Sequence, residues 1–335
     1  MIITRTPFRI SFFGGGTDYP AWYEKNGGAV LATSIDKYCY ISIRYLPPFF
    51  EHRHRIVYSR VEHVTSINEI QHPTVKAILD ELNPKKGLEI HHDGDLPARA
   101  GLGSSSSFAV GLLNAINALG GRRSTKQNLA DHATHIEQNI MKENVGCQDQ
   151  ITTAYGGFNI IKFEPDGTKT VSPIIASTAN IRHLEGSMML FYTGVSRFAS
   201  EIAGEQLKNF SNRKSELTQM HKIVEEGAKI LDQQTDPIKE FGKLLHESWA
   251  LKRTLARSIT NSEIDDIYEK GCGAGAYGGK LLGAGGGGFI IFVAPKEKHS
   301  MIKEVLSNLV YVNFKFDHDG SKVIVYDPED TENSS

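Results

Sequence analysis

The sequence has few cysteines and no long apolar run. Its three cysteines, Cys39, Cys147 and Cys272, are far apart and form no C-x-x-C pair, so neither a disulfide framework nor a zinc site is indicated. No run approaches the ~18 apolar residues that a membrane helix needs. The first ten residues carry charges where a signal peptide has an apolar core. We therefore expect reduced thiols in a soluble, cytoplasmic protein.

The sequence also lacks an excess of charge of either sign. A formal net charge of −2 over 335 residues gives no long-range attraction for nucleic acid or for an anionic membrane. We expect neither as a partner, and the sequence leaves the oligomeric state open between monomer and homodimer. The length corresponds to about two domains at roughly 150 residues each, and a content of 40% hydrophobic and 23% charged residues is typical of packed globular domains.

Strand and helix patterns are mixed along the chain. β-branched and aromatic residues bounded by Gly or Pro predict strands at 8–13, 38–44, 55–58, 88–91, 188–193 and 287–293. Apolar spacing predicts helices at 108–119, 196–207, 223–231 and 238–255. A further helix is indicated by a capping-box pair, Ser124 and Gln127, followed by an apolar stripe of Leu129, Ala133, Ile136 and Ile140. No regular βαβ order is present, so we predict an α+β fold. We divide it into domains at 1–180 and 181–327, followed by a polar tail at 328–335.

Two glycines and four serines, at 101–107, directly precede the predicted helix at 108–119. A flexible linker would be followed by more polar, low-complexity sequence. The alternative is a phosphate-binding loop, in which small residues let backbone N–H groups approach phosphate oxygens and the helix N-terminus adds partial positive charge. Serine hydroxyls can also donate to phosphate or bind Mg²⁺. The periodic helix that follows favours the phosphate-binding loop.

Two better-known phosphate motifs do not fit the sequence. A Walker A loop requires a lysine directly after its last glycine, and none follows Gly103; the Gly279-Lys280 pair has alanine where the first glycine is needed. The letters of a Rossmann fingerprint occur at 283–288, but they lead into a predicted strand and not into a helix.

Three motifs in order resemble those of the GHMP kinases, the superfamily of galactokinase, homoserine kinase, mevalonate kinase and phosphomevalonate kinase. The stretch 97–107, PARAGLGSSSS, is similar to the central P-x-x-x-G-L-G-S-S motif, 7–19 to the first and 280–289 to the third. The resemblance therefore spans nearly the whole chain. It implies an N-terminal half like ribosomal protein S5 domain 2 and a ferredoxin-like C-terminal half, with the site between them.

Within the superfamily, FFGGGTDYP at 12–20 resembles the D-glycero-D-manno-heptose 7-phosphate kinases, whereas galactokinases have Glu-His in place of Gly15-Gly16. This resemblance implies ATP-dependent transfer of the γ-phosphate to the anomeric hydroxyl of that heptose phosphate. The alternatives are a kinase for galactose, fucose, another sugar or a mevalonate-type substrate, an ATP-dependent decarboxylase, a non-catalytic ligand sensor and an RNA-binding S5-like module.

The resemblance also implies roles for individual residues. ATP and Mg²⁺ would be required, with Ser105 and Glu137 as metal ligands. Helical spacing by itself only places Glu137 at the edge of a buried stripe, a position where an ordinary surface glutamate is also expected. Asp149 would face the acceptor hydroxyl and pair with Arg9. The phosphate-binding residues would be Gly101, Leu102, Gly103, Ser104, Ser105, Ser106 and Ser107, and the substrate-binding residues Gly15, Gly16, Thr17, Asp18, Tyr19, Gly285 and Gly286.

Each of these side chains also has a purely structural interpretation. Asp18 and Asp149 could be turn residues and Arg9 could form a structural ion pair. The histidines at 52, 54, 91 and 92 suggest a metal site only weakly, because arginines flank the first two and adjacent strand residues point to opposite faces. A heptose 7-phosphate would need a cationic clamp, for which Arg197 is one candidate.

Overall fold

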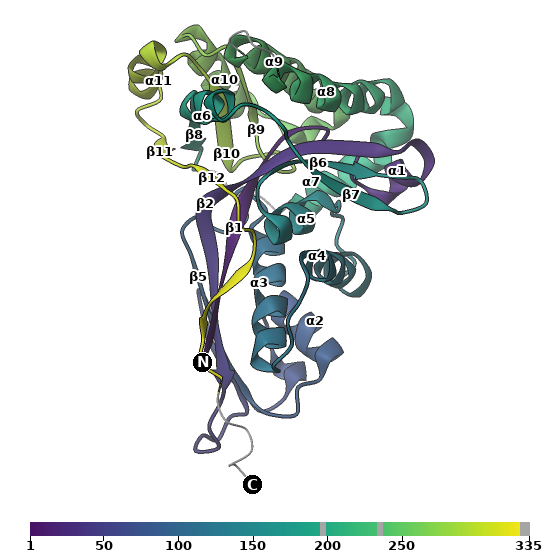
Figure 1. The fold of residues 1–335 in the computed structure, drawn as a ribbon, viewed down its shortest axis with the longest axis vertical. Coiled ribbons are helices and arrows are strands. Elements are labelled where there is room, and N and C mark those ends of the chain that lie inside the picture. Colours follow the sequence, from purple (N-terminus) through teal and green to yellow (C-terminus); the bar gives the residue numbers. More distant parts are fainter. Residues whose placement is uncertain (195–198, 233–236, 329–335) are drawn as a thin grey trace.

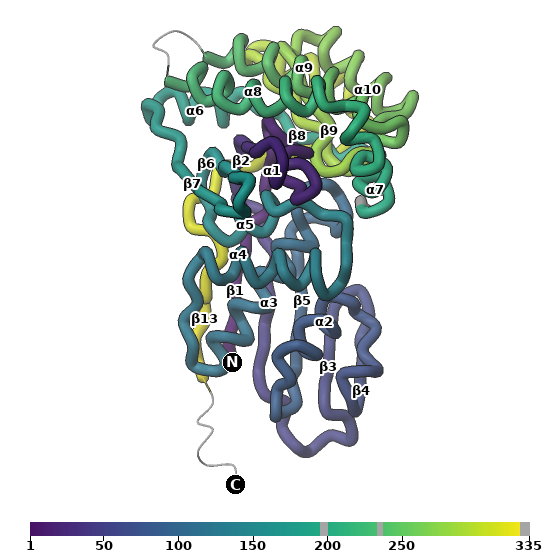
Figure 2. Tube along the Cα trace, turned by 90° about the vertical axis from the view of Figure 1, so that its right-hand side faces the viewer, coloured from purple at the N-terminus to yellow at the C-terminus, as the bar shows by residue number. Residues whose placement is uncertain are grey.

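The computed structural model describes residues 1–194, 199–232 and 237–328. These residues form an elongated molecule with a large sheet running through one part and a smaller sheet with its own helices in the other (Figure 1). The predicted α+β class is confirmed. Figure 2 shows that α1 and β6 lie where the two parts meet.

The larger sheet has nine strands, and all of its pairs are antiparallel except β3 with β5. The four strands predicted between residues 8 and 91 all lie in it. Its long central pair is β1 with β2, which brings the end of the first motif into the middle of the molecule. The strands are β1 (Ile2–Phe13), β2 (Gly28–Tyr45), β3 (His54–Val57), β4 (Val61–Val64), β5 (Leu88–Gly94), β6 (Phe158–Phe163), β7 (Lys169–Pro173), β12 (Phe316–Asp317) and β13 (Lys322–Tyr326).

Helices cover one face of this sheet (Figure 1). They are α2 (Pro73–Leu82), α3 (Ser104–Leu119), α4 (Lys126–His135) and α5 (Gln148–Tyr155), and the shorter elements are α1 (Pro20–Asn26), η1 (Ile67–Glu69) and η2 (Ile136–Ile140). Helix α3 packs on both β1 and β2, and its apolar residues Leu112 and Leu113 are fully buried there. The helix that carries the glycine-serine segment is therefore a core element and not a surface linker.

The smaller sheet has the antiparallel order β11-β8-β10-β9. Its strands are β8 (Met188–Tyr192), β9 (Gly278–Leu281), β10 (Phe289–Val293) and β11 (Val310–Val312). The elements around it are α6 (Thr178–Gly186), α7 (Ala199–Asn209), η3 (Phe210–Arg213), α8 (Lys214–Asp232), α9 (Ile238–Leu255), η4 (Arg257–Ile259), α10 (Ser262–Gly273), η5 (Lys296–Lys298) and α11 (His299–Val305). No helix within the described ranges is long and apolar enough to cross a membrane.

The end of the chain returns to the larger sheet. Strand β12 pairs with β2, and β13 pairs with β1 from Ile2 to Arg5. These short strands carry little sequence signal, because Lys322–Tyr326 is only five residues long and its side chains are half-buried or exposed. The division of the chain at residue 180 stays a prediction, and this pairing places the last part of the 181–327 range against the N-terminal sheet.

The predicted capping box before α4 is wrong by one residue. Thr125 is the N-cap, and its hydroxyl accepts a hydrogen bond from the Asn128 N–H at 3.1 Å. The Ser124 hydroxyl instead accepts from the Asn117 side-chain amide at 2.9 Å. Helix α4 therefore begins at Lys126, because the residue whose oxygen reaches the free N–H groups determines where a helix starts.

Candidate functional site

The glycine-serine segment is a short loop followed by the first turn of a helix. Gly101 and Gly103 have φ angles of +83° and +74°, which favour glycine, and Gly103 is the N-cap of α3. The first helical hydrogen bond joins the Ser107 N–H to the Gly103 carbonyl at 2.8 Å. The N–H groups of residues 104–106 precede that bond and have no acceptor within the helix. Together with the helix dipole, they form a place where a phosphate can bind.

The serines of this turn have different environments. The exposed Ser105 donates to Glu137 Oε1 at 2.7 Å, and the buried Ser106 donates to Glu137 Oε2 at 2.8 Å. Ser107 is fully buried, and its hydroxyl lies 2.9 Å from the carbonyl oxygens of both Pro7 and Gly103. Because its N–H is also used within the helix, Ser107 has no donor left for a ligand. Its predicted role as a phosphate contact is corrected to a structural one.

Glu137 lies in a π-helical turn, Ile136–Ile140, that continues α4. The side chain is 0% exposed and also accepts a hydrogen bond from the Gln150 side-chain amide. Regular helical spacing places Glu137 at the edge of the buried stripe and Ile140 inside it, but Ile140 is 38% exposed. The wider π turn rotates the residues that follow relative to α4, so it turns Glu137 inward and Ile140 outward.

Burial raises the pKa of Glu137 to about 7, although three hydrogen bonds to the carboxylate favour its charged form. No ion pair neutralises this carboxylate within the described part of the chain. A buried carboxylate beside the exposed Ser105 hydroxyl supplies two hard oxygen ligands, which fits Mg²⁺, an ion that uses few protein ligands and retains waters or phosphate oxygens. Among the described residues, no cluster of three or more His, Cys, Asp or Glu side chains could hold a metal.

Arg9 and Asp149 form a bidentate ion pair. Arg9 Nε donates to Asp149 Oδ1 and Nη2 donates to Oδ2, each at 2.7 Å. A third donor, Nη1, reaches the Gly101 carbonyl at 2.7 Å, and the Arg9 backbone N–H donates to the Leu102 carbonyl at 3.0 Å. Arg9 therefore joins β1, the glycine loop and Asp149 at one point.

The position of Asp149 against the phosphate loop follows from the packing of α5. Asp149 is in the first turn of α5, where the helix dipole favours a carboxylate. A Cβ atom placed on Gly103 would lie 3.6 Å from Asp149 Oδ2 and 3.0 Å from Arg9 Cγ. A side chain at position 103 would thus crowd the pair, which explains the glycine and places the carboxylate directly beside the phosphate loop.

Asp18 is a buried carboxylate on the other side of Asp149. It is 1% exposed and accepts hydrogen bonds from the backbone N–H groups of Gly16 at 3.0 Å and Gln148 at 3.3 Å. Burial, and secondarily the charge of Asp149, raise the pKa of Asp18 to about 6. Residues 15–18 do form a turn, so the turn interpretation and the ligand interpretation of Asp18 are compatible.

Thr17 of the first motif differs from its predicted role. The Thr17 hydroxyl is fully buried, lies within 2.9 Å of the carbonyl oxygens of Gly14 and Ala29, and accepts from the Ala29 N–H at 3.1 Å. Thr17 therefore ties the turn to β2, and its side chain is corrected from a substrate ligand to a structural residue. The Tyr19 ring packs edge-on against Phe210, with centroids 5.8 Å apart.

Two buried polar atoms beside Gly15 have no partner among the described residues. They are Ser11 Oγ and Gln148 Oε1. A Cβ on Gly15 would lie 3.8 Å from Ser11 Oγ and 3.6 Å from Gln148 Nε2, so both side chains border this glycine. An unpaired buried hydroxyl or amide oxygen costs free energy unless a ligand or water completes it. Motif comparison missed both residues, and only their orphaned atoms identify them.

The third glycine motif packs against the second. A Cβ on Gly283 would lie 2.4 Å from Gly101 Cα, and one on Gly288 would lie 2.3 Å from the Ala100 carbonyl oxygen. Gly285 and Gly286 are next to η4, where the Gly286 N–H donates to the Ile259 carbonyl at 2.8 Å. The structure therefore brings all three motifs together, although Gly286 uses its N–H within the protein.

Two buried lysines donate hydrogen bonds to backbone carbonyl groups where the motifs lie together. The sequence analysis identified neither of them as functional. Lys252, from α9, donates to the carbonyl oxygens of Leu281 at 3.3 Å and of Gly283. Lys280 donates to the Phe12 carbonyl at 2.8 Å and so links β9 to β1. Burial, followed by the charge of Arg9, lowers the pKa of Lys252 to about 7. The candidate clamp Arg197 lies outside the described residues.

Comparisons with known proteins agree with this geometry. The description "GHMP kinases N terminal domain" matches residues 68–157, and "GHMP kinases C terminal" matches residues 234–311. The chain is 30% identical to a D-glycero-alpha-D-manno-heptose 7-phosphate kinase of Campylobacter jejuni, over 96% of this chain and 98% of that protein. It is 26% identical to a galactokinase of Pyrococcus furiosus, over 98% of each chain.

The fold is also found among solved structures. A D-glycero-D-manno-heptose 1-phosphate kinase from Bacteriodes thetaiotaomicron matches with a TM-score of 0.79 and 22% identity, over 98% of this chain and 100% of that chain. At this identity the likeness shows that the two chains share a fold.

Proposed function

Because the chain belongs to the GHMP kinases, we propose that it transfers the γ-phosphate of ATP to the anomeric hydroxyl of D-glycero-D-manno-heptose 7-phosphate. The Campylobacter jejuni relative, which aligns over nearly the full length of both chains, is named for a heptose 7-phosphate substrate. The observation that carries the proposal is the position of Asp149, whose Oδ2 lies 3.6 Å from the Cβ position of Gly103 in the phosphate loop.

The residues of the chain suit phosphoryl transfer, which depends mainly on positioning and on neutralising the charge of the transferred group. The free N–H groups of residues 104–106 would bind phosphate oxygens. Ser105 and Glu137 would hold Mg²⁺, which when bound neutralises charge on those oxygens. Of the predicted phosphate contacts, Ser107 is excluded from this role because its donors are used within the protein.

Asp149 would act on the acceptor. Its carboxylate would accept a hydrogen bond from the anomeric hydroxyl, orient that oxygen toward the γ-phosphorus, and take the proton as the new O–P bond forms. Arg9 holds the carboxylate through two hydrogen bonds, which fixes the direction in which Asp149 presents its lone pairs. The bond between the γ-phosphorus and the ADP oxygen breaks as the new O–P bond forms, so each transfer releases one ADP and one heptose 1,7-bisphosphate.

The sugar itself would lie against the first and third motifs. Asp18 offers a buried carboxylate for vicinal hydroxyls, and the orphaned Ser11 Oγ and Gln148 Oε1 offer two further hydrogen-bonding positions near Gly15. A Cβ on Gly15 would lie no closer than 3.6 Å to a neighbouring atom, so this glycine leaves room for a ligand beside the turn, whereas Gly16 packs against Leu217 and Leu255. Gly16 and Gly285 stay predicted substrate contacts. A polyhydroxylated acceptor would satisfy polar atoms that the protein leaves unpaired.

A coupled assay of ADP release tests the proposal. The purified protein is given ATP, Mg²⁺ and, separately, D-glycero-D-manno-heptose 7-phosphate, the unphosphorylated heptose, mannose, galactose, fucose and mevalonate. We expect the heptose 7-phosphate to have the highest kcat/KM and the product to carry a new phosphate on C1, identified by ³¹P NMR. Preference for another acceptor would refute the proposed substrate. If no acceptor led to ADP release, the assignment of kinase activity would be refuted. Carbon dioxide release from a phosphorylated mevalonate would identify a decarboxylase instead.

A further inference from the structure

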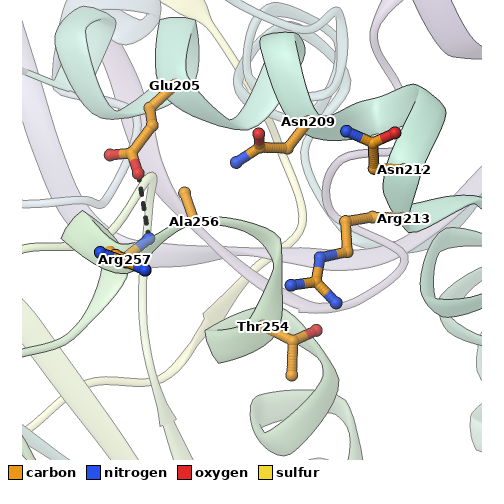
Figure 3. Close-up of a pocket in the computed structure, with 7 residues that line it drawn as sticks. All are labelled: Glu205, Asn209, Asn212, Arg213, Thr254, Ala256 and Arg257. Carbon is orange, nitrogen blue, oxygen red and sulfur yellow. Dashed lines mark hydrogen bonds between the residues drawn. The ribbon is translucent and has the colours of Figure 1, made fainter.

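A pocket that no motif includes lies between α7 and the end of α9 (Figure 3). Its cavity volume is about 360 Å³, which is large enough for a phosphate group with its hydration. The side chains around it come from α7, η3, the last turn of α9 and η4. The lining residues are Glu205, Asn209, Asn212, Arg213, Thr254, Ala256 and Arg257.

The pocket contains two guanidinium groups. Arg213 donates to Glu216 at 2.9 Å through Nη1 only, so its other nitrogens remain available within the described part of the chain. The exposed Arg257 donates no side-chain hydrogen bond to any described residue. Figure 3 shows that the two arginines come from different elements, Arg213 from η3 and Arg257 from η4. This arrangement can contact one anion from two sides.

Glu205, which supplies the one carboxylate among the lining residues, has a structural role. Glu205 accepts hydrogen bonds from the Arg257 backbone N–H at 3.1 Å and from the Ser258 hydroxyl. The hydrogen bond from Ser258 is the main reason that the pKa of Glu205 is lowered. No ion pair joins Glu205 to either arginine among the described residues. Both guanidinium groups therefore keep donors for a ligand, and the lining carries more positive than negative charge.

The pocket adjoins the candidate sugar site through η3. Phe210 directly follows Asn209, which lines the pocket, and its ring packs edge-on against Tyr19, with centroids 5.8 Å apart. The Asn209 side-chain amide donates to the Leu255 carbonyl at 2.9 Å. One wall of the pocket is thus the same element that packs on the first motif.

The opposite wall touches both substrate motifs. A Cβ on Gly16 would lie 3.8 Å from Leu255 Cδ1, and the Ile259 carbonyl accepts from the Gly286 N–H at 2.8 Å. The segment between these two contacts supplies Ala256 and Arg257 to the pocket. The segment from Leu255 to Ile259 therefore connects the pocket to both the first and the third motif.

From this arrangement we infer that Arg213 and Arg257 form the subsite for the phosphate that the acceptor already carries, at the end of the sugar remote from the anomeric hydroxyl. The inference rests on the proposed function and assigns residues to a part of the substrate for which the motif resemblance names no ligand. Guanidinium groups suit a phosphate monoester because their N–H groups pair with its oxygens and carry charge. The amides of Asn209 and Asn212 add neutral donors at the rim.

Steady-state kinetics of Arg213→Ala, Arg257→Ala and the double variant test the subsite, with D-glycero-D-manno-heptose 7-phosphate and unphosphorylated heptose as acceptors. Removing one charged hydrogen-bonding partner should raise KM for the phosphorylated sugar about 10- to 100-fold. We expect little change in kcat and no change in kcat/KM for the unphosphorylated sugar. Inorganic phosphate should compete with heptose 7-phosphate in the wild-type enzyme and compete less well in the variants.

Arg123→Ala is the control, because it removes an exposed positive charge in the α3–α4 connection, away from the pocket. An unchanged KM for heptose 7-phosphate in the double variant would overturn the subsite while leaving the kinase assignment intact. An equal loss with both sugars would also overturn it, since the arginines would then be supporting the fold. If the wild-type enzyme did not phosphorylate heptose 7-phosphate, the proposed function would be refuted. The assignment of a sugar phosphate to the pocket would then be refuted as well.

Discussion

The guanidinium of Arg9 and the carboxylate of Asp149 share two parallel hydrogen bonds of 2.7 Å, although the residues are 140 positions apart in the chain. Arg9 is almost fully buried, with its side chain 5% exposed, whereas the Asp149 side chain is 27% exposed. The pair therefore has a protected cation behind an accessible carboxylate. This asymmetry is what a group that acts on an incoming hydroxyl requires.

Asp149→Asn should lower kcat by roughly 100- to 10,000-fold, because an amide cannot take the proton of the acceptor. Arg9→Lys should also lower kcat while leaving KM for ATP nearly unchanged, since lysine keeps the charge and loses the bidentate geometry. Steady-state assays of ADP release measure both. Asp319→Asn changes a carboxylate in the exposed pair with Arg5 and serves as the control. Full turnover by Asp149→Asn would show that another group faces the acceptor.

Glu137→Gln should make the protein more stable at pH 8 and less active. The folded protein holds the pKa of Glu137 at about 7, above its ordinary value of 4.5. The stability that this group contributes to the wild type is therefore fully present below pH 4.5 and is lost as the pH rises through 7. The variant avoids that loss, which amounts to about 3 kcal/mol at pH 8. Urea unfolding at pH 8 and pH 4.5 measures the difference.

The effects of Glu137→Gln on stability and on activity can be measured separately, by varying the pH and the Mg²⁺ concentration. The stability gain should vanish at pH 4.5, where the wild-type carboxyl is already neutral, and the Mg²⁺ concentration for half-maximal activity should rise because an amide is a weaker ligand. In the wild type, that Mg²⁺ concentration should increase as the pH falls below about 7. If the variant were no more stable than the wild type at pH 8 and required no additional Mg²⁺, the buried carboxylate would have neither role.

Gly146→Ala should damage sugar binding. A Cβ at this position would lie 1.8 Å from Asp18 Oδ2, so the Asp18 carboxylate or the backbone must move. We expect KM for the sugar to rise about tenfold or more, with a smaller change in KM for ATP, because a shift of about 1 Å in a positioned group costs up to 100-fold. Gly273→Ala is the matched control, since a Cβ there would meet nothing within 4 Å. Equal kinetics for the two variants would contradict the role of Asp18.

Lys252→Met should lower kcat/KM by roughly 100-fold, because it releases the third motif from the carbonyl contacts at Leu281 and Gly283. Lys243→Met is the control, because Lys243 is on the exposed side of α9 and its one ion pair among the described residues is with Glu240. Thermal melting of both variants distinguishes a local effect from general unfolding. Retention of normal kinetics by a folded Lys252→Met protein would show that the loop keeps its position without the lysine.

Much of the site was predictable because its motifs are local in sequence. Glycines at 101 and 103 and the serines after them indicate a helix N-terminus without any knowledge of the fold. The family resemblance then identified Arg9 and Asp149, whose pairing the structure provides. No spacing rule predicts that pairing, because it depends on β1 and α5 meeting across the core.

The sequence-based predictions that were wrong failed for physical reasons that the spacing of apolar residues does not show. A π turn changed the phase of the helix at Glu137 and Ile140, and tertiary hydrogen bonds occupied the hydroxyls of Thr17 and Ser107. Gln148 and Lys252 lie outside the three motifs, and Ser11 lies inside the first motif without a role that the resemblance assigns to it. They become visible only through burial, through an unpaired atom or through a carbonyl contact from another element.

The return of the last strands to the first sheet affects the order in which the protein can fold during synthesis. Strand β1 is made first, but its partner β13 is made last, after the entire smaller sheet. Until then, the outer edge of β1 offers unpaired N–H and C=O groups that can pair with another chain. A truncated chain ending at residue 180 should therefore aggregate when expressed alone. The nascent larger sheet depends on the completed C-terminal segment, or on a chaperone, to protect that edge.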